Sequence, residues 1–116
     1  MEITVRWLHG THVLALSGNP GLEGTARLRG AFREALGEGR RQFVLNLQEV
    51  GSLDSLTLGE LVGCVKRARE HKGDVRLVVV PDGIVHELLQ LAGLDRVFRI
   101  FGDEGEAAAS YGKAAS

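Results

Sequence analysis

Hydrophobic and polar positions change their period several times along the chain, and each period predicts a different element. Residues 3–8 and 12–16 have the pattern of strands, and the short polar segment between them predicts a hairpin. Residues 42–47 predict a third strand. Residues 75–80 are nearly all apolar and β-branched, which is typical of a central strand covered on both faces. A short strand is expected at residues 97–101.

Between these strands the apolar residues recur at helical spacing, which predicts four helices. They are expected at about residues 22–36, from Asp54 onward, from Pro81 to Gly93, and over residues 104–111. The faces expected to point inward hold Leu28, Phe32, Ala35 and Leu36 in the first helix, Leu58, Leu61, Val62 and Val65 in the second, and Ile84, Val85, Leu88 and Leu89 in the third.

The order of these elements predicts an α/β fold. Strands that alternate with helices imply mostly parallel pairing with right-handed crossovers. We therefore expect a mixed, mostly parallel sheet of about five strands, with an N-terminal hairpin at one edge and about four helices packed on it. The 116 residues fit one domain over residues 1–112, with a short small-residue tail at 113–116.

Composition excludes several classes of partner. The net charge is −1 and aromatic residues make up 5% of the chain, so neither a nucleic acid nor an anionic membrane is an expected partner. The longest apolar runs have four residues, which excludes a transmembrane helix. The N-terminus does not have the pattern of a secretory signal, and the single cysteine suits a reducing compartment. A cytoplasmic location is expected.

The residues that carry chemistry do not form a catalytic or metal-binding pattern. None of the four histidines stands at a metal-ligand spacing from Cys, Asp or Glu. Gly18, Gly21 and Gly24 are spaced unlike a phosphate-binding loop, and they favour a turn and a helix start. Cys64 lies next to the predicted buried stripe and is expected to pack there. We expect no catalytic residue, metal or cofactor.

The most informative pair of residues is Asp54-Ser55, at the junction between the third strand and the second helix. One interpretation is a helix cap, made by Asp54, by Ser55, or by Thr57 in a capping box with Glu60. The other is phosphorylation of Ser55, because a helix N-terminus stabilises a phosphate through its dipole and free N–H groups. The residues alone favour the cap.

Residues 43–55, Phe-Val-Leu-Asn-Leu-Gln-Glu-Val-Gly-Ser-Leu-Asp-Ser, resemble the core of a STAS domain of the anti-sigma factor antagonist family. Residues 91–101 resemble the C-terminal motif of that family. The resemblance implies a bacterial regulator that binds an anti-sigma serine kinase and is released when the serine after the signature aspartate is phosphorylated. That serine corresponds to Ser55, with Thr57 a less favoured acceptor. The partner-binding residues expected on this basis are Asp54, Ser55, Leu56, Thr57, Gly21 and Glu23.

Three departures from the family pattern keep other functions open. Leu56 replaces a second serine, Thr57 replaces a glycine, and Asn46 stands where an aspartate is usual. One alternative is a STAS module that does not switch and serves as a scaffold or as the partner of a transport ATPase. A second alternative is a sensor of a small ligand or nucleotide. The oligomeric state is left open by the sequence.

Overall fold

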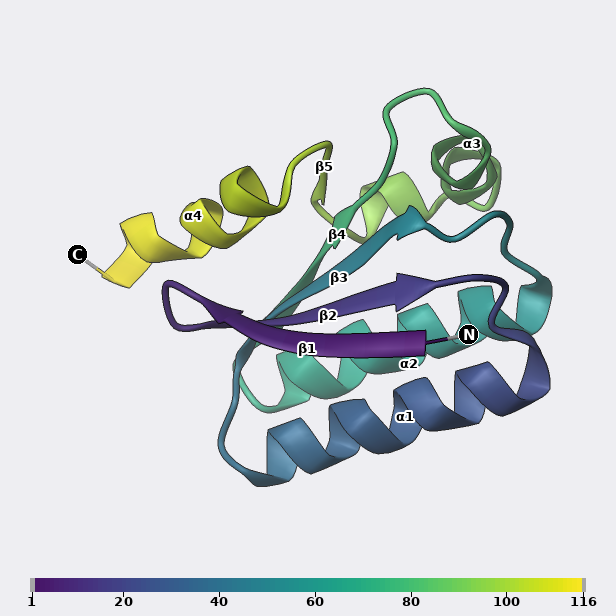
Figure 1. Ribbon diagram of the computed structural model, residues 1–116. Coiled ribbons are helices and arrows are strands. Elements are labelled where there is room, and N and C mark those ends of the chain that lie inside the picture. The colour runs from purple at the N-terminus through teal and green to yellow at the C-terminus, as the bar shows by residue number, and fades with distance from the viewer. Residues whose placement is uncertain (1, 116) are drawn as a thin grey trace.

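The protein is described by a computed structural model that covers residues 2–115 (Figure 1). Within this range the strands are β1 (Glu2–Leu8), β2 (Thr11–Ser17), β3 (Gln42–Glu49), β4 (Asp74–Val78) and β5 (Ile100–Phe101). The α-helices are α1 (Gly21–Gly37), α2 (Ser55–Glu70), α3 (Ile84–Leu91) and α4 (Glu104–Ala115), and a 3-10 turn, η1, covers Leu94–Arg96.

The strands form one sheet in the order β1-β2-β3-β4-β5. β1 pairs antiparallel with β2, and every other neighbouring pair is parallel. The expected α/β fold, with an antiparallel hairpin at the edge of a mostly parallel sheet, is confirmed. Because the crossovers run between parallel strands, α1, α2 and α3 all begin at the same end of the sheet, where β2, β3 and β4 finish.

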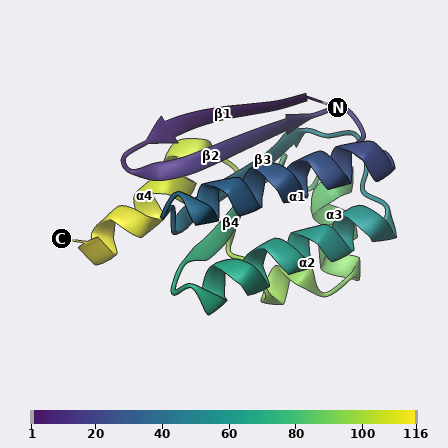
Figure 2. The same ribbon diagram turned by 90° about the horizontal axis from the view of Figure 1, so that it is seen from below.

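Helices cover both faces of the sheet. α1 and α2 lie side by side on one face, and α4 lies on the other (Figures 1 and 2). Successive residues of a strand point to opposite faces, so Phe43, Leu45 and Leu47 of β3 join the main core, while Val44 packs under α4. Within the described residues, no helix is long and apolar enough to cross a membrane.

Several details of the prediction were wrong. Val62 was expected in the buried stripe of α2, but its side chain is 37% exposed, and Cys64 and Ala68 are buried instead. Ile84 was also expected to point inward, but it is 62% exposed at the start of α3, whose buried residues are Val85 and Leu89. The expected strand at residues 97–101 shortens to β5, because the N–H groups of Val97 and Phe98 donate to the carbonyl of Leu94 and continue the turn of η1. α4 continues to Ala115, through most of the expected tail, and residue 116 lies outside the described range.

Candidate functional site

The loop from β3 to α2 presents the predicted serine. β3 ends at Glu49, and the side chains of Val50 and Leu53 are buried, which fixes the loop against the core. Between them, Gly51 and Ser52 are exposed. The loop that leads into the first turn of α2 is therefore anchored to the core at two positions.

Asp54 is the N-cap of α2. Its backbone is extended, and its Oδ1 accepts hydrogen bonds of 2.8 Å from the backbone N–H and from the hydroxyl of Thr57. These hydrogen bonds hold the pKa of the Asp54 carboxyl below its usual value. A capping box that begins at Thr57 was one interpretation of the sequence, and it is wrong because Thr57 lies inside the first turn.

Ser55 is the first residue of α2, and its side chain is exposed. It forms no hydrogen bond with any described residue, so it is not the cap that the alternative interpretation allowed. The first N–H groups of a helix have no partner within the helix, and the helix dipole places positive potential there. A phosphate on Ser55 would therefore meet favourable backbone groups, with the Asp54 carboxylate beside it.

Thr57 faces the opposite way from Ser55. It is fully buried, and its hydroxyl lies 3.3 Å from the hydroxyl of Thr25 on α1. Thr25 in turn donates to the carbonyl of Gly21 at 2.5 Å. The two threonines thus connect the first turns of α1 and α2. This burial favours Ser55 over Thr57 as an acceptor, and it removes the Thr57 side chain from the expected partner surface.

The turn before α1 lies against the same loop. Gly18 and Gly21 both have positive φ, which glycine adopts without strain. A cavity of about 180 Å³ separates this turn from the α2 loop, and its walls include Asn19, Gly21 and Asp54. The structure therefore brings Gly21 and Asp54 together, as the predicted surface requires. Glu23 is exposed on the first turn of α1.

An exposed apolar side chain stands in the first turn of each of the three helices that begin at this end of the sheet. These side chains are Leu22, Leu56 and Ile84, which we call the apolar rim. Ile84 lines a second cavity, of about 240 Å³, together with Val50 and Gly51 of the α2 loop. The sequence prediction included Leu56 but missed Leu22 and Ile84, because helical periodicity assigned Ile84 to the core. The signal that could identify them is an apolar residue at the start of each helix.

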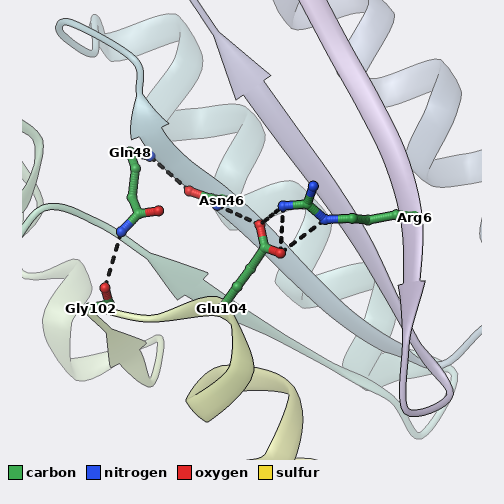
Figure 3. Close-up of polar contacts among 5 residues, drawn as sticks. All are labelled: Arg6, Asn46, Gln48, Gly102 and Glu104. Carbon is green, nitrogen blue, oxygen red and sulfur yellow. Dashed lines mark hydrogen bonds and ion pairs between the residues drawn. The ribbon is translucent and has the colours of Figure 1, made fainter.

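Asn46 does not belong to this site. It points toward α4, on the opposite face of the sheet from α2, where its amide donates to Glu104 at 2.5 Å and its carbonyl accepts from the N–H of Gln48 (Figure 3). Arg6 binds the same carboxylate through Nε and Nη2. Asn46 therefore contacts α4 and not the loop that carries Ser55, and its hydrogen bond to Glu104 helps to hold α4 on the sheet.

Cys64 and Glu60, the other reactive side chains near α2, are buried and have structural roles. Cys64 is buried against Glu60, and burial together with that carboxylate raises the pKa of its thiol to about 12. Glu60 is itself buried, with Arg29 at 2.8 Å and Arg67 at 3.7 Å. Among residues 2–115, no group of three or more His, Cys, Asp or Glu side chains could hold a metal ion.

The fold and this arrangement are those of a STAS domain. The family model described as "Mlab, STAS domain" matches residues 3–101, and the chain belongs to that family. A Thermotoga maritima protein named "Putative anti-sigma factor antagonist" is 36% identical over 76 residues, which are 66% of this chain and 66% of the relative.

Solved structures agree with this assignment. The crystal structure of a Thermotoga maritima protein of that same name has a TM-score of 0.84 at 27% identity, over 93% of this chain and 92% of the other. The Bacillus cell fate determinant SpoIIAA in its phosphorylated form has a TM-score of 0.74 at 19% identity, over 95% and 99% of the two chains. At that identity SpoIIAA shows only that the fold is shared.

Proposed function

We propose that this chain is an anti-sigma factor antagonist whose binding to an anti-sigma serine kinase is switched by phosphorylation of Ser55. The observation that carries the proposal is the exposed hydroxyl of Ser55, which is free of hydrogen bonds in the described structure and stands at the N-terminus of α2. The similarity to proteins named as anti-sigma factor antagonists supports the same class of function.

The surroundings of Ser55 fit a contact surface. The apolar rim would supply buried area to a partner, and Asp54, Gly21 and Glu23 would supply polar contacts around it. Such a surface binds by excluding water from a few apolar anchors while the polar groups set specificity. The contact between Thr25 and Thr57 joins the first turns of α1 and α2, the turns that also carry Leu22 and Leu56.

Phosphorylation would alter this surface without unfolding it. A phosphoserine adds roughly −1.5 to −2 charges at neutral pH. The N-terminus of α2 would stabilise this charge within the protein. A partner that closes over Leu56 would have to desolvate the phosphate, and an acidic partner surface would be repelled by both the phosphate and Asp54. Binding would therefore be lost while the fold is kept.

The first test is the site of modification. The chain is incubated with its partner kinase and ATP, and phosphopeptides are mapped by mass spectrometry. We expect phosphate on Ser55, no incorporation into Ser55→Ala, and unchanged incorporation into Ser52→Ala, a matched control in the same exposed loop. Phosphate on another residue, or none at all, would contradict the proposal.

The second test is the effect on binding. We expect Ser55→Ala to bind the kinase as the unmodified chain does, and Ser55→Asp to bind at least tenfold more weakly, which corresponds to about 1.4 kcal/mol. Ser52→Asp adds the same charge nearby and should retain most of the affinity. Isothermal titration calorimetry with the purified kinase measures all four proteins.

A second candidate function uses the same surface without a switch. Leu56, in place of a serine, adds an apolar contact whose contribution does not depend on phosphorylation. The chain would then be a constitutive scaffold or the partner of a transport ATPase. A partner that is captured equally by the unmodified chain and by Ser55→Asp, and that is lost with Leu56→Glu, would favour this second function.

A further inference from the structure

The outer edge of β1 is an unprotected sheet edge. β1 is seven residues long, pairs with β2 on one side only, and keeps a continuous register without a bulge. It contains no proline, glycine or lysine, the residues that commonly protect exposed edges. The opposite edge is different, because β5 has only two residues. An edge strand leaves alternate main-chain N–H and C=O groups free for another strand.

The side chains of β1 are mostly exposed as well. On the α1 side of the sheet, Val5 is 49% exposed and Trp7 is 46% exposed. On the α4 side stand Glu2, Thr4 and Arg6, because alternate residues of a strand share a face. Two large apolar side chains and two opposite charges thus line one accessible strand.

The two charges make β1 complementary to a second copy of itself. When two such strands pair antiparallel about Thr4, Glu2 of each copy lies opposite Arg6 of the other, on the same face. Pairing about Val5 would place Arg6 opposite Thr4 and Glu2 opposite Leu8. Pairing about Arg6 would place two guanidinium groups opposite one another. Opposite charges stabilise a cross-strand pair and like charges destabilise it, so the charges select the pairing about Thr4.

Both charged side chains have hydrogen-bonding atoms available for this contact. Arg6 uses Nε and Nη2 to bind Glu104, and its Nη1 has no hydrogen-bond partner in the described structure (Figure 3). Its side chain remains 53% exposed. The side chain of Glu2 is exposed and forms no hydrogen bond or ion pair with the described residues. A carboxylate from a second copy could therefore bind Nη1 while the contact with Glu104 is kept.

We propose that β1 pairs antiparallel with β1 of a second copy of this chain, centred on Thr4, and joins the two sheets into one. Two Glu2–Arg6 ion pairs then flank the Thr4–Thr4 pair on the α4 face. On the α1 face, Val5 of each copy lies opposite Ile3 of the other, which covers apolar area that one copy leaves exposed. The arrangement has twofold symmetry and is closed, as is usual for homodimers.

The proposed interface leaves the Ser55 surface free. β1 lies at a lateral edge of the sheet, whereas Ser55 and the apolar rim lie where β2, β3 and β4 end (Figure 1). Each copy in the dimer could thus present its own Ser55 surface. An experiment that disproves the dimer therefore leaves the proposed phosphorylation switch untouched, and the reverse also holds.

The test is the mass of the full chain, with no added N-terminal segment, measured by sedimentation equilibrium over a range of concentrations. We expect a dimer for the unmodified chain and for Glu70→Arg, an exposed control at the end of α2. Glu2→Arg should shift the equilibrium toward monomer by at least tenfold in dissociation constant. The side chain of Glu2 forms no hydrogen bond or ion pair within its own copy, so Glu2→Arg should leave the fold intact, which circular dichroism checks.

A cysteine variant tests the register. Residues directly opposite in antiparallel strands have Cα atoms about 4.5–5.5 Å apart, a separation that a disulfide can span. Thr4→Cys should therefore form a disulfide-linked dimer with oxidised glutathione, whereas the surface control Glu70→Cys should not. A monomer at all concentrations, a dimer insensitive to Glu2→Arg, or the absence of the Thr4→Cys cross-link would each overturn the proposal.

Discussion

Individual side chains explain how this chain departs from the STAS sequence pattern. Thr57 occupies the position of a glycine, but its side chain is buried against Thr25 and does not project toward a partner. Asn46 stands where an aspartate is usual, and it needs an amide because its partner is the carboxylate of Glu104. Both substitutions are thus accounted for by contacts inside the domain.

The role of Asn46 can be tested with one substitution. Asn46→Asp would place a second carboxylate against Glu104 and remove the donated hydrogen bond, so we expect a loss of about 1–3 kcal/mol in the free energy of unfolding at pH 7. The deficit should shrink near pH 4, where carboxyl groups begin to protonate. Urea unfolding at the two pH values measures it.

Asn46→Ala is the matched control, because it removes the donor without adding a charge. Its loss of stability should be smaller than that of Asn46→Asp at pH 7. If the aspartate variant were as stable as the unmodified chain at pH 7, the contact with Glu104 would not have the role assigned to it.

At the scale of elements, α4 is held on the sheet by contacts at its start and in its second half. Near its start, Glu104 binds Arg6 and Asn46. Further along, the hydroxyl of Tyr111 donates to the carbonyl of Phe43 at 2.8 Å, and the guanidinium of Arg76 lies 3.7 Å from the centre of its ring. These contacts add to the apolar packing of Ala107 with Val44 and Val78 of the sheet.

Two substitutions separate the contributions of Tyr111. Tyr111→Phe removes a buried hydrogen bond and keeps the ring, and we expect it to lower the free energy of unfolding by about 1 kcal/mol. Tyr111→Leu removes the ring as well, and the loss of the contact with Arg76 should add about 0.5–2 kcal/mol. Urea unfolding followed by circular dichroism gives both values. Equal stability of Tyr111→Phe and the unmodified chain would contradict this account.

The elements themselves were largely predictable from the sequence, because strand and helix periods are local properties. The errors arose where burial depends on distant parts of the chain. Ile84 and Val62 have helical spacing typical of a core face, but both side chains are exposed. α1 contacts α2 through Thr57 and Glu60, which lie on a different face of that helix from Val62. The position of Ser55 at the start of α2 was predictable from the local pattern. The contact of Thr57 with Thr25 joins residues 32 positions apart and has no local signal.

At the scale of the whole molecule, stability is linked to pH by groups whose pKa is shifted in the folded protein, and His12 and Glu104 are two of them. His12 lies between the rings of Trp7 and Phe43, and its pKa is lowered by burial and by the positive charge of Arg40, against a smaller opposing effect of Glu38. Glu104 is half-buried, and despite that burial its pKa is held low by hydrogen bonds from Arg6 and Asn46. Both groups bind protons more readily in the unfolded chain than in the folded protein.

The sign of the effect is the same for both groups. Where the unfolded state binds more protons, stability falls as the pH falls. For His12, the loss begins near pH 6.5, the ordinary pKa of histidine in an unfolded chain, and continues down to its lower folded pKa. For Glu104, the contribution is complete above about pH 4.3 and is lost as the pH falls through the depressed folded pKa. Acidification should therefore destabilise the protein in two stages.

Replacement of His12 should abolish the loss of stability that begins near pH 6.5 and leave the loss at lower pH unchanged. We expect the urea midpoint of the unmodified chain to fall between pH 7 and pH 5, and that of His12→Gln to stay nearly constant over this range, because no buried imidazole remains to be protonated. His9→Asn is the control, since His9 is an exposed histidine of the neighbouring turn with positive φ, a conformation that asparagine tolerates. It should keep the decline of the unmodified chain. Equal declines in His12→Gln and the unmodified chain would show that another group governs stability in this range.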